Sequence, residues 1–170
     1  MVGDFAREAC VFEGIDSIDF QLALRALITA ALGFLVGWER ERQGSAAGDR
    51  TYALVALGAA AFTTIAIDRF QGSAPQLLGG IVTGVGFLGA GMIMHEGGTV
   101  RGLTSAAALW ATAAIGMVVG SGDLIIGVAL TVFVLVILVW ERVPGVRRIG
   151  YARHREGGPS STAPPTMEDG

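Results

Sequence analysis

Long apolar segments constrain the fold of this chain more than any other feature of its sequence. Five such segments follow one another, and nearly all charged residues lie between them. They cover approximately residues 20–38, 51–67, 76–94, 103–120 and 124–140. A helix of about 17–25 apolar residues crosses the hydrocarbon core of a bilayer. The pattern therefore predicts an all-α, polytopic membrane protein with about five glycine-rich transmembrane helices and short loops.

Composition argues against the main alternative, a soluble helical bundle. Hydrophobic residues make up 52% of the chain and charged residues only 16%, whereas about a quarter of the residues in a soluble domain are charged. The chain has one cysteine, Cys10, and therefore no pair for an internal disulfide bond. No basic region followed by an apolar stretch stands at the N-terminus, so we expect no cleavable signal peptide.

The distribution of arginine predicts the orientation in the membrane. With five spans, the loops after the first and third helices share one side with the C-terminal tail. That side carries Arg40, Arg42, Arg50, Arg101, Arg142, Arg147, Arg148, Arg153 and Arg155, against Arg7 and Arg69 on the other. Basic loops remain in the cytoplasm, so we expect an outside N-terminus and a cytoplasmic C-terminus in a bacterial inner (plasma) membrane. Trp38, Tyr52 and Trp140 then lie at the cytoplasmic interface, which amphipathic rings favour.

We expect three parts along the chain. Residues 1–18 form an extracytoplasmic N-terminal segment, residues 19–141 the five-helix transmembrane domain, and residues 142–170 a cytoplasmic tail. The tail is rich in arginine and then in glycine, proline and serine. Such a composition cannot bury a core, so we expect the tail to be disordered.

Glycines concentrate in the third apolar segment and form small-xxx-small steps in three helices. The steps are Gly33/Gly37, Gly80/Gly84 and Gly116/Gly120. In lipid, glycine lets neighbouring backbones approach closely, so we expect a central third helix and a homo-oligomer formed through glycine faces. The alternative is a locally unwound segment whose carbonyls meet an ion. It would contain Gly84, Gly86, Gly89 and Gly91.

One arginine, Arg25, lies inside the first apolar segment. An arginine in the membrane costs about 2.5–3.5 kcal/mol unless its side chain reaches the interface or a partner. Two interpretations stay open. The side chain locks helices together at the outer end, near Asp19, Asp68 or Asp123, or it takes part directly in transport or partner binding.

Acids and arginines alternate in the two arginine-rich loops. The acids are Glu39, Glu41, Asp49 and Glu96, and the arginines are Arg40, Arg42, Arg50 and Arg101, with His95 beside them. Clustered carboxylates suit Mg²⁺, but the equal numbers favour a network of ion pairs that joins the loops. We predict no resident metal or cofactor, and association with Mg²⁺ is the alternative.

No catalytic motif is present. The sequence has no H-E-x-x-H metal site, no phosphate-binding loop that ends in lysine and no nucleophile elbow. We therefore expect a protein that is not an enzyme. Its expected partners are membrane lipid, further copies of itself and another membrane protein, with no nucleic acid.

Two long motifs make the chain resemble a known family. The first is Gly33-x-x-x-Gly37-Trp38-Glu39-Arg40-Glu41, followed by Gly48-Asp49-Arg50-Thr51. The second is GVGFLGAGMI at residues 84–93, followed by VRGLTSAA at 100–107 and Leu109-Trp110. In this order and spacing, across about residues 20–140, they resemble the signatures of the MgtC/SapB family.

That resemblance implies a regulator of the bacterial inner membrane. Its members are linked to growth in low Mg²⁺, to acid stress and to survival inside phagocytes, and they act on membrane partners such as the F-type ATP synthase or a transporter. The chain resembles the short form of the family, without the soluble C-terminal domain of the virulence members. Where the family usually has Thr or Asn followed by Thr, this chain has Thr104-Ser105.

The candidate functional residues follow from these motifs. In the cytoplasmic loops they are Glu39, Arg40, Glu41, Asp49, Arg50, Thr51, Glu96, Arg101 and Thr104. Within the membrane they are Arg25, Gly84, Gly86, Gly89, Gly91 and Trp110. The leading hypothesis is a non-enzymatic regulator. The alternatives are an oligomeric transporter or channel for Mg²⁺ or a small solute, and a structural subunit of a larger complex.

Overall fold

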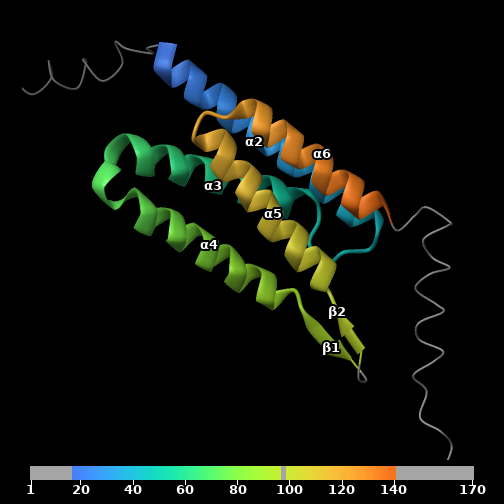
Figure 1. Ribbon diagram of the computed structural model, residues 1–170. Coiled ribbons are helices and arrows are strands. Elements are labelled where there is room, and N and C mark those ends of the chain that lie inside the picture. The colour runs from blue at the N-terminus through green and yellow to red at the C-terminus, as the bar shows by residue number, and fades with distance from the viewer. Residues whose placement is uncertain (1–16, 97–98, 141–170) are drawn as a thin grey trace, which may run out of the picture. The chain divides into compact units, whose positions relative to one another are not determined.

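The five apolar segments are all helical in a computed structural model, which describes residues 17–96 and 99–140 (Figure 1). A 3₁₀ turn and a two-stranded hairpin accompany the helices in the described residues. In chain order the elements are α2 (Ser17–Arg42), α3 (Asp49–Arg69), η1 (Gln71–Ser73), α4 (Ala74–Gly91), β1 (Met94–Glu96), β2 (Thr99–Arg101), α5 (Leu103–Gly120) and α6 (Leu124–Trp140). The predictions for residues 1–16 and for the tail at 142–170 lie outside the described residues.

Four of these helices, α2 to α5, are long and apolar enough to cross a membrane. The fifth, α6, has 17 residues and is apolar throughout, which puts it at the lower limit of about 17 residues for a span. The prediction of a predominantly helical, multi-pass membrane protein is confirmed. The chain divides into two units, Met1–Val136 and Ile137–Gly170. The packing described below lies within the first.

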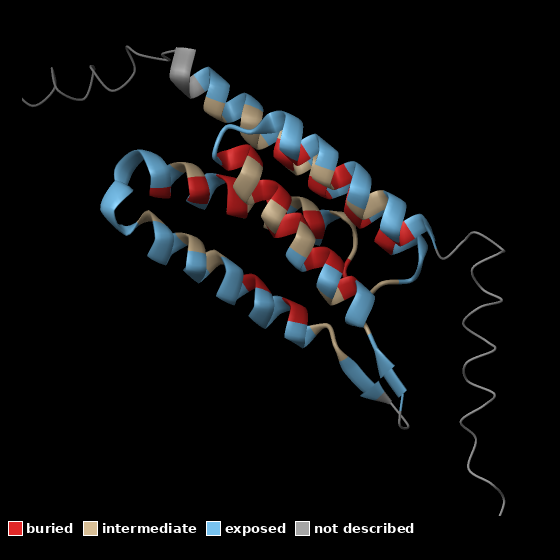
Figure 2. Ribbon diagram, viewed as in Figure 1, coloured by how far each residue is buried: buried red, intermediate tan, exposed pale blue. Residues whose placement is uncertain are grey.

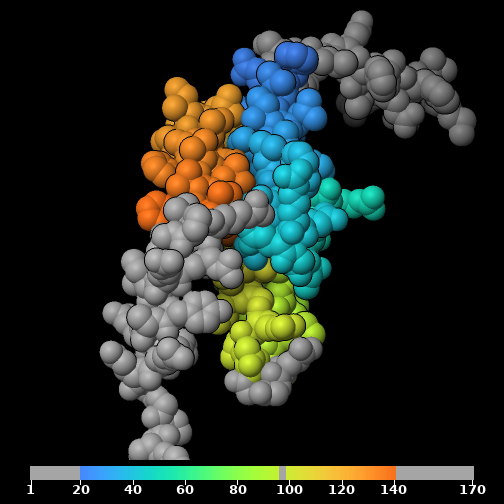
Figure 3. All heavy atoms as spheres, turned by 90° about the vertical axis from the view of Figure 1, so that its right-hand side faces the viewer, coloured from blue at the N-terminus to red at the C-terminus, as the bar shows by residue number. Residues whose placement is uncertain are grey.

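The segment predicted as a loop after the third helix is instead a β-hairpin. Helix α4 ends at Gly91, and β1 pairs with β2 antiparallel, with Met94 opposite Arg101. The sequence carries a signal for this turn, because Gly97-Gly98 stands between the strands and two-residue hairpin turns favour glycine. The hairpin extends past the end of α2 (Figures 1 and 3).

Helices α3 and α5 form the centre of the bundle. Buried residues are frequent on both and sparse on α4 (Figure 2): half of the apolar window of α5 is buried, compared with 11% for α4. Small residues such as Ala56, Ala60 and Ala113 occupy the buried faces of α3 and α5. The expectation of a central third helix is therefore wrong, because the fourth apolar segment, α5, takes that place.

Glycines bring α2 and α5 against α3. A Cβ on Gly37 would lie 2.6 Å from the Cα of Asp49, and one on Gly33 would lie 2.7 Å from the Cβ of Ala56. Gly116 and Gly120 of α5 face the backbone carbonyls of Ala56 and Ala60 in the same way. Two of the three predicted small-xxx-small steps are thus packing contacts, in which backbones approach as they do in membrane helix pairs generally.

The glycines of α4 behave differently. Of the six, only Gly89 approaches a described neighbour, Ala106 of α5, at 3.5 Å from a would-be Cβ. The other five have no described atom within 4 Å of that position: Gly79, Gly80, Gly84, Gly86 and Gly91. The Gly80/Gly84 step therefore packs against nothing in the described part of the chain.

The packed glycines of α2 and the open glycines of α4 predict opposite effects of a Gly→Ala substitution on stability. In Gly37→Ala, the new methyl group overlaps the first turn of α3, and overpacking of this kind destabilises by about 1–3 kcal/mol. In Gly79→Ala, the methyl group meets open space and helix propensity rises by about 1 kcal/mol. Thermal unfolding in a mild detergent should show a lower midpoint for Gly37→Ala and an equal or higher midpoint for Gly79→Ala. Equal losses would contradict the packing role.

Candidate functional site

Arg40 lies buried where the end of α2 meets α3 and α5. Its side chain is only 7% exposed. One terminal nitrogen, Nη1, donates to Oε1 of Gln43 at 2.6 Å, and the other, Nη2, donates to Oγ of Ser105 at 3.2 Å. The buried Nε has no hydrogen-bond partner among the described residues. A charge removed from water needs such partners, because its desolvation is expensive.

Ser105, in the first turn of α5, connects Arg40 to the rest of the site. The Ser45 hydroxyl lies 2.9 Å from the Ser105 hydroxyl, and the Tyr52 hydroxyl donates to the Ser105 carbonyl at 2.9 Å. Tyr52 is fully buried. These five residues, which we call the Arg40 cluster, join α2, the following loop, α3 and α5: Arg40, Gln43, Ser45, Tyr52 and Ser105.

Local structure explains why these side chains converge. Arg40 follows the fully buried Val36 by four residues, so both lie on the inner face of α2. Gly37 lets this part of α2 touch the first turn of α3, which carries Tyr52. Gly102 starts α5 in the left-handed conformation, φ +90°, against the carbonyl of Met92. Only glycine fits this position without strain.

Two of the predicted carboxylates cap α3. Glu41 accepts the backbone N–H of Asp49 at 3.2 Å, and the Asp49 carboxylate accepts the N–H of Arg50 at 2.6 Å. The first amides of a helix have no partner within it, and a negative charge at this end is favourable. Glu41 and Asp49 therefore have a local structural role.

For two arginines of the predicted ion-pair network, the structure describes contacts of other kinds. Arg40 donates to neutral oxygens, and the Arg42 guanidinium lies 4.2 Å from the ring centre of Trp38, as a cation–π pair. Glu39 accepts a hydrogen bond from Gln43 at 2.8 Å. Among the described residues, no group of three or more His, Cys, Asp or Glu side chains lies close enough to hold a metal ion.

Four of the other loop candidates lie at the surface. Arg50, Thr51, Arg101 and Thr104 are exposed, and Glu96 pairs with Thr99 in the hairpin. Of the two hydroxyls at 104 and 105, the buried one that contacts Arg40 belongs to Ser105. Tyr52, which the sequence places at the depth of the membrane interface, has a side chain that is fully buried between the helices.

Arg25 is half-buried and contacts the turn between α5 and α6. Its Nη1 atom lies 3.5 Å from the position of a Cβ on Gly122. The carbonyls at a helix C-terminus attract positive charge, so this position, just past the end of α5, favours the interpretation of an arginine that locks helices. Trp110 is 52% exposed on α5.

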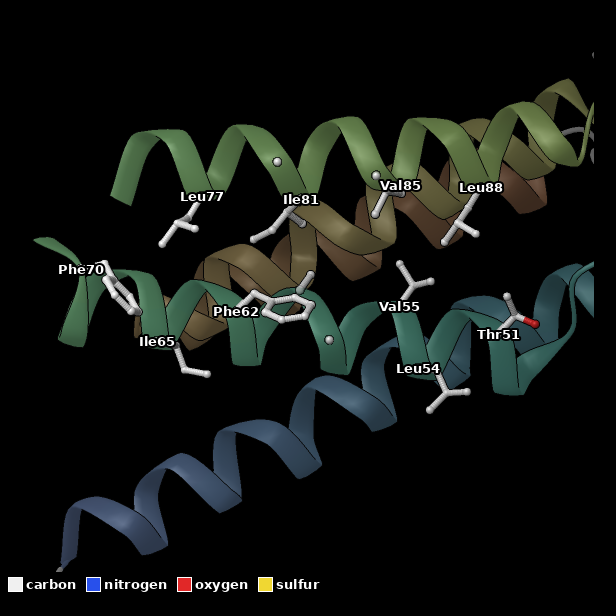
Figure 4. A pocket seen from close by; sticks show the side chains of 14 residues that line it. Thr51, Leu54, Val55, Phe62, Ile65, Phe70, Leu77, Ile81, Val85 and Leu88 are labelled. Carbon is white, nitrogen blue, oxygen red and sulfur yellow. The ribbon is translucent and has the colours of Figure 1, made fainter. Parts of the chain in front are cut away.

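The alternative of an unwound glycine segment is wrong, since α4 is helical through Gly91. Its side chains instead form one wall of an apolar groove whose other wall is α3. Leu77, Ile81 and Val85 of α4 point toward α3, which contributes Val55 and Phe62 (Figure 4). No sequence signal singled out this groove.

Comparison with known proteins settles the family. The MgtC family model matches residues 27–144, a range that contains the Arg40 cluster and both walls of the groove. The chain belongs to the MgtC family. The resemblance found in the sequence motifs is thereby confirmed.

Several curated relatives are called Protein MgtC. The one from Salmonella typhimurium is 44% identical over 116 residues, which is 68% of this chain and 50% of the relative. The one from Brucella abortus is 44% identical over 127 residues, 74% of this chain and 53% of the relative. The chain thus spans about half the length of these relatives. No solved structure matches it.

The Arg40 cluster predicts different roles for two adjacent hydroxyls. Ser105→Ala removes a hydrogen-bond partner from a buried guanidinium, which should lower the free energy of unfolding by about 1–3 kcal/mol. Thr104→Ala, at an exposed position, should change it by less than about 0.5 kcal/mol. Unfolding in mixed detergent micelles measures both. An equal loss at Thr104 would contradict the assignment.

Proposed function

We propose that this protein is a non-enzymatic regulator of the bacterial inner membrane that acts by contacting another membrane protein. Membership of the MgtC family supports this proposal, and so does the construction of the site. The motif residues build a closed, hydrogen-bonded junction around Arg40 instead of an open polar cavity. Such a junction fixes the shape of the surface above it. A surface of fixed shape suits recognition of a partner protein better than catalysis.

We propose that the protein acts in adaptation to low Mg²⁺ or acid stress and in virulence-related survival of the bacterium inside phagocytes, as the family resemblance implies. We place the N-terminus outside and the arginine-rich loops in the cytoplasm. The loop after α2 and the projecting hairpin then form the face offered to a partner, such as the F-type ATP synthase or a transporter. Homo-oligomers through the free glycines of α4 are also part of the proposal.

The arrangement favours regulation over the alternative of an oligomeric Mg²⁺ or solute channel. A conducting path needs polar groups or water along its length. The large groove between α3 and α4 is lined almost entirely by apolar side chains. Arg25, the one charge deep in a span, contacts the end of α5.

Crosslinking in living membranes tests the regulatory role. A photoreactive residue at exposed His95 of the hairpin should yield a discrete adduct with another membrane protein. The same residue at exposed Gln71, at the opposite end of the bundle, serves as the matched control. Adducts with lipid alone at both positions would contradict the proposal, as would Mg²⁺ flux above that of empty vesicles in liposomes containing only the folded protein.

The orientation has its own test. In a Cys10→Ser background, single cysteines replace His95 and Ser121, both exposed at opposite ends of the helices. Because basic loops stay inside, a membrane-impermeant maleimide should label position 121 in cells whose outer barrier is opened. It should label position 95 only after the inner membrane is permeabilised. The reverse pattern would overturn the assignment.

A further inference from the structure

Four exposed residues of α4 form one row along the helix, which we call the α4 seam: Gly80, Gly84, Phe87 and Gly91. They follow one another at steps of four, three and four residues. At about 100° per residue, all four lie within about 60° of one another around the helix axis. Most of α4 is exposed (Figure 2). Steps of four and three residues are the spacing along which two helices pack in a left-handed pair.

The α4 seam has both a projecting side chain and the space to receive one. Phe87 projects from it and is 80% exposed. At Gly80, Gly84 and Gly91, no described atom lies within 4 Å of the Cβ that each would carry. Gly84 precedes Phe87 by three residues and Gly91 follows it by four, so both are neighbours of the ring on the helix surface. An open position therefore lies on each side of the ring along the row.

A hollow of about 510 Å³ lies beside Phe87, and Phe87, Leu88 and Gly91 line it from α4. In a parallel helix pair, each projecting side chain enters a hole formed by four residues of the facing helix. For Phe87 in two copies of the α4 seam, these four are Gly84, Phe87, Leu88 and Gly91. Three of the four line the hollow. The hollow thus lies where Phe87 of a second copy would enter.

Helix α4 carries no charge that would repel a second copy, because Ala74–Gly91 contains no Asp, Glu, Lys or Arg. A two-fold interface needs a surface that is complementary to itself. The α4 seam meets this requirement, since the ring and the recesses that fit it lie on the same row. A lipid chain would fill the recesses but leave the ring without a matching hole. In the other two glycine steps of the chain, a neighbouring helix already occupies the space in front of the glycines.

We infer that two copies of this protein pair through the α4 seam. The two α4 helices are parallel, and Phe87 of each copy packs between Gly84 and Gly91 of the other. The second copy also covers the edge of the groove between α3 and α4, which Gly80 and Gly84 line. This inference deepens the homo-oligomer of the proposed function and rests on that part of it alone.

Disulfide crosslinking in native membranes tests the arrangement. In a Cys10→Ser background, Gly84→Cys places a thiol on the α4 seam, and Gly86→Cys places one on another side of the helix. Identical positions in two copies form a disulfide only where their Cα atoms come within about 7 Å, which requires a position near the two-fold axis. A mild oxidant should give a covalent dimer with Gly84→Cys and little with Gly86→Cys. Equal yields, or a dimer with Gly86→Cys alone, would overturn the inference.

Removing the ring tests the contact itself. Copies labelled at Cys10, the one cysteine of the chain, are mixed in liposomes, and energy transfer between labels is followed as the protein is diluted with lipid. Phe87→Ala should weaken dimerisation by about tenfold or more, as truncation of a packed aromatic residue in an interface does. Phe133→Ala, which removes a ring that is 64% exposed on α6, should leave it unchanged. Thermal unfolding confirms that both variants are folded.

The outcomes separate this inference from the proposed function. Undiminished dimerisation of Phe87→Ala would overturn the pairing through the α4 seam and leave the proposed homo-oligomer standing. A wild-type chain that stays monomeric in liposomes would overturn both. The regulatory role is read separately, from the adduct that a photoreactive residue at His95 forms with another membrane protein.

Discussion

Contact between backbones at four glycines holds the centre of this molecule together. Gly33 and Gly37 bring α2 onto α3, and Gly116 and Gly120 bring α5 onto the same helix. Lipid supplies little hydrophobic force between helices, so close packing of this kind must hold them. The polar junction depends on it: Arg40 reaches Ser105 only because α2 and α5 both lie against α3 at this end of the bundle.

The Arg40 cluster shows how neutral side chains of the described residues hold a charge at the end of a membrane helix. The terminal nitrogens of Arg40 donate to the side-chain amide oxygen of Gln43 and to the Ser105 hydroxyl. The Tyr52 hydroxyl donates to the Ser105 carbonyl of α5. Breaking such a set is expensive, since a buried charge would lose its partners. The junction therefore fixes the relative positions of α2, α3 and α5 beneath the loops that carry the family motifs.

Helix α4 contrasts with this rigid centre. It touches α5 near Gly89 but leaves a groove against α3. Gly80 and Gly84 line that groove, and none of the other five glycines has a described atom within 4 Å of a would-be Cβ. The same residue type thus serves two purposes in one chain, close packing in α2 and α5 and open space in α4. A lipid or protein that fills the groove would contact α4, the least buried of the helices α2–α5.

The sequence by itself determined the helices, since apolar length dictates spans in a bilayer, and its motifs led to the family and to Arg40. Only the tertiary structure decided which glycines pack, because Gly80/Gly84 and Gly116/Gly120 look alike until a neighbouring helix is in place. It also decided that Ser105, and not Thr104, meets Arg40. Adjacent helix residues point about 100° apart, and the direction that becomes buried depends on where the other helices lie.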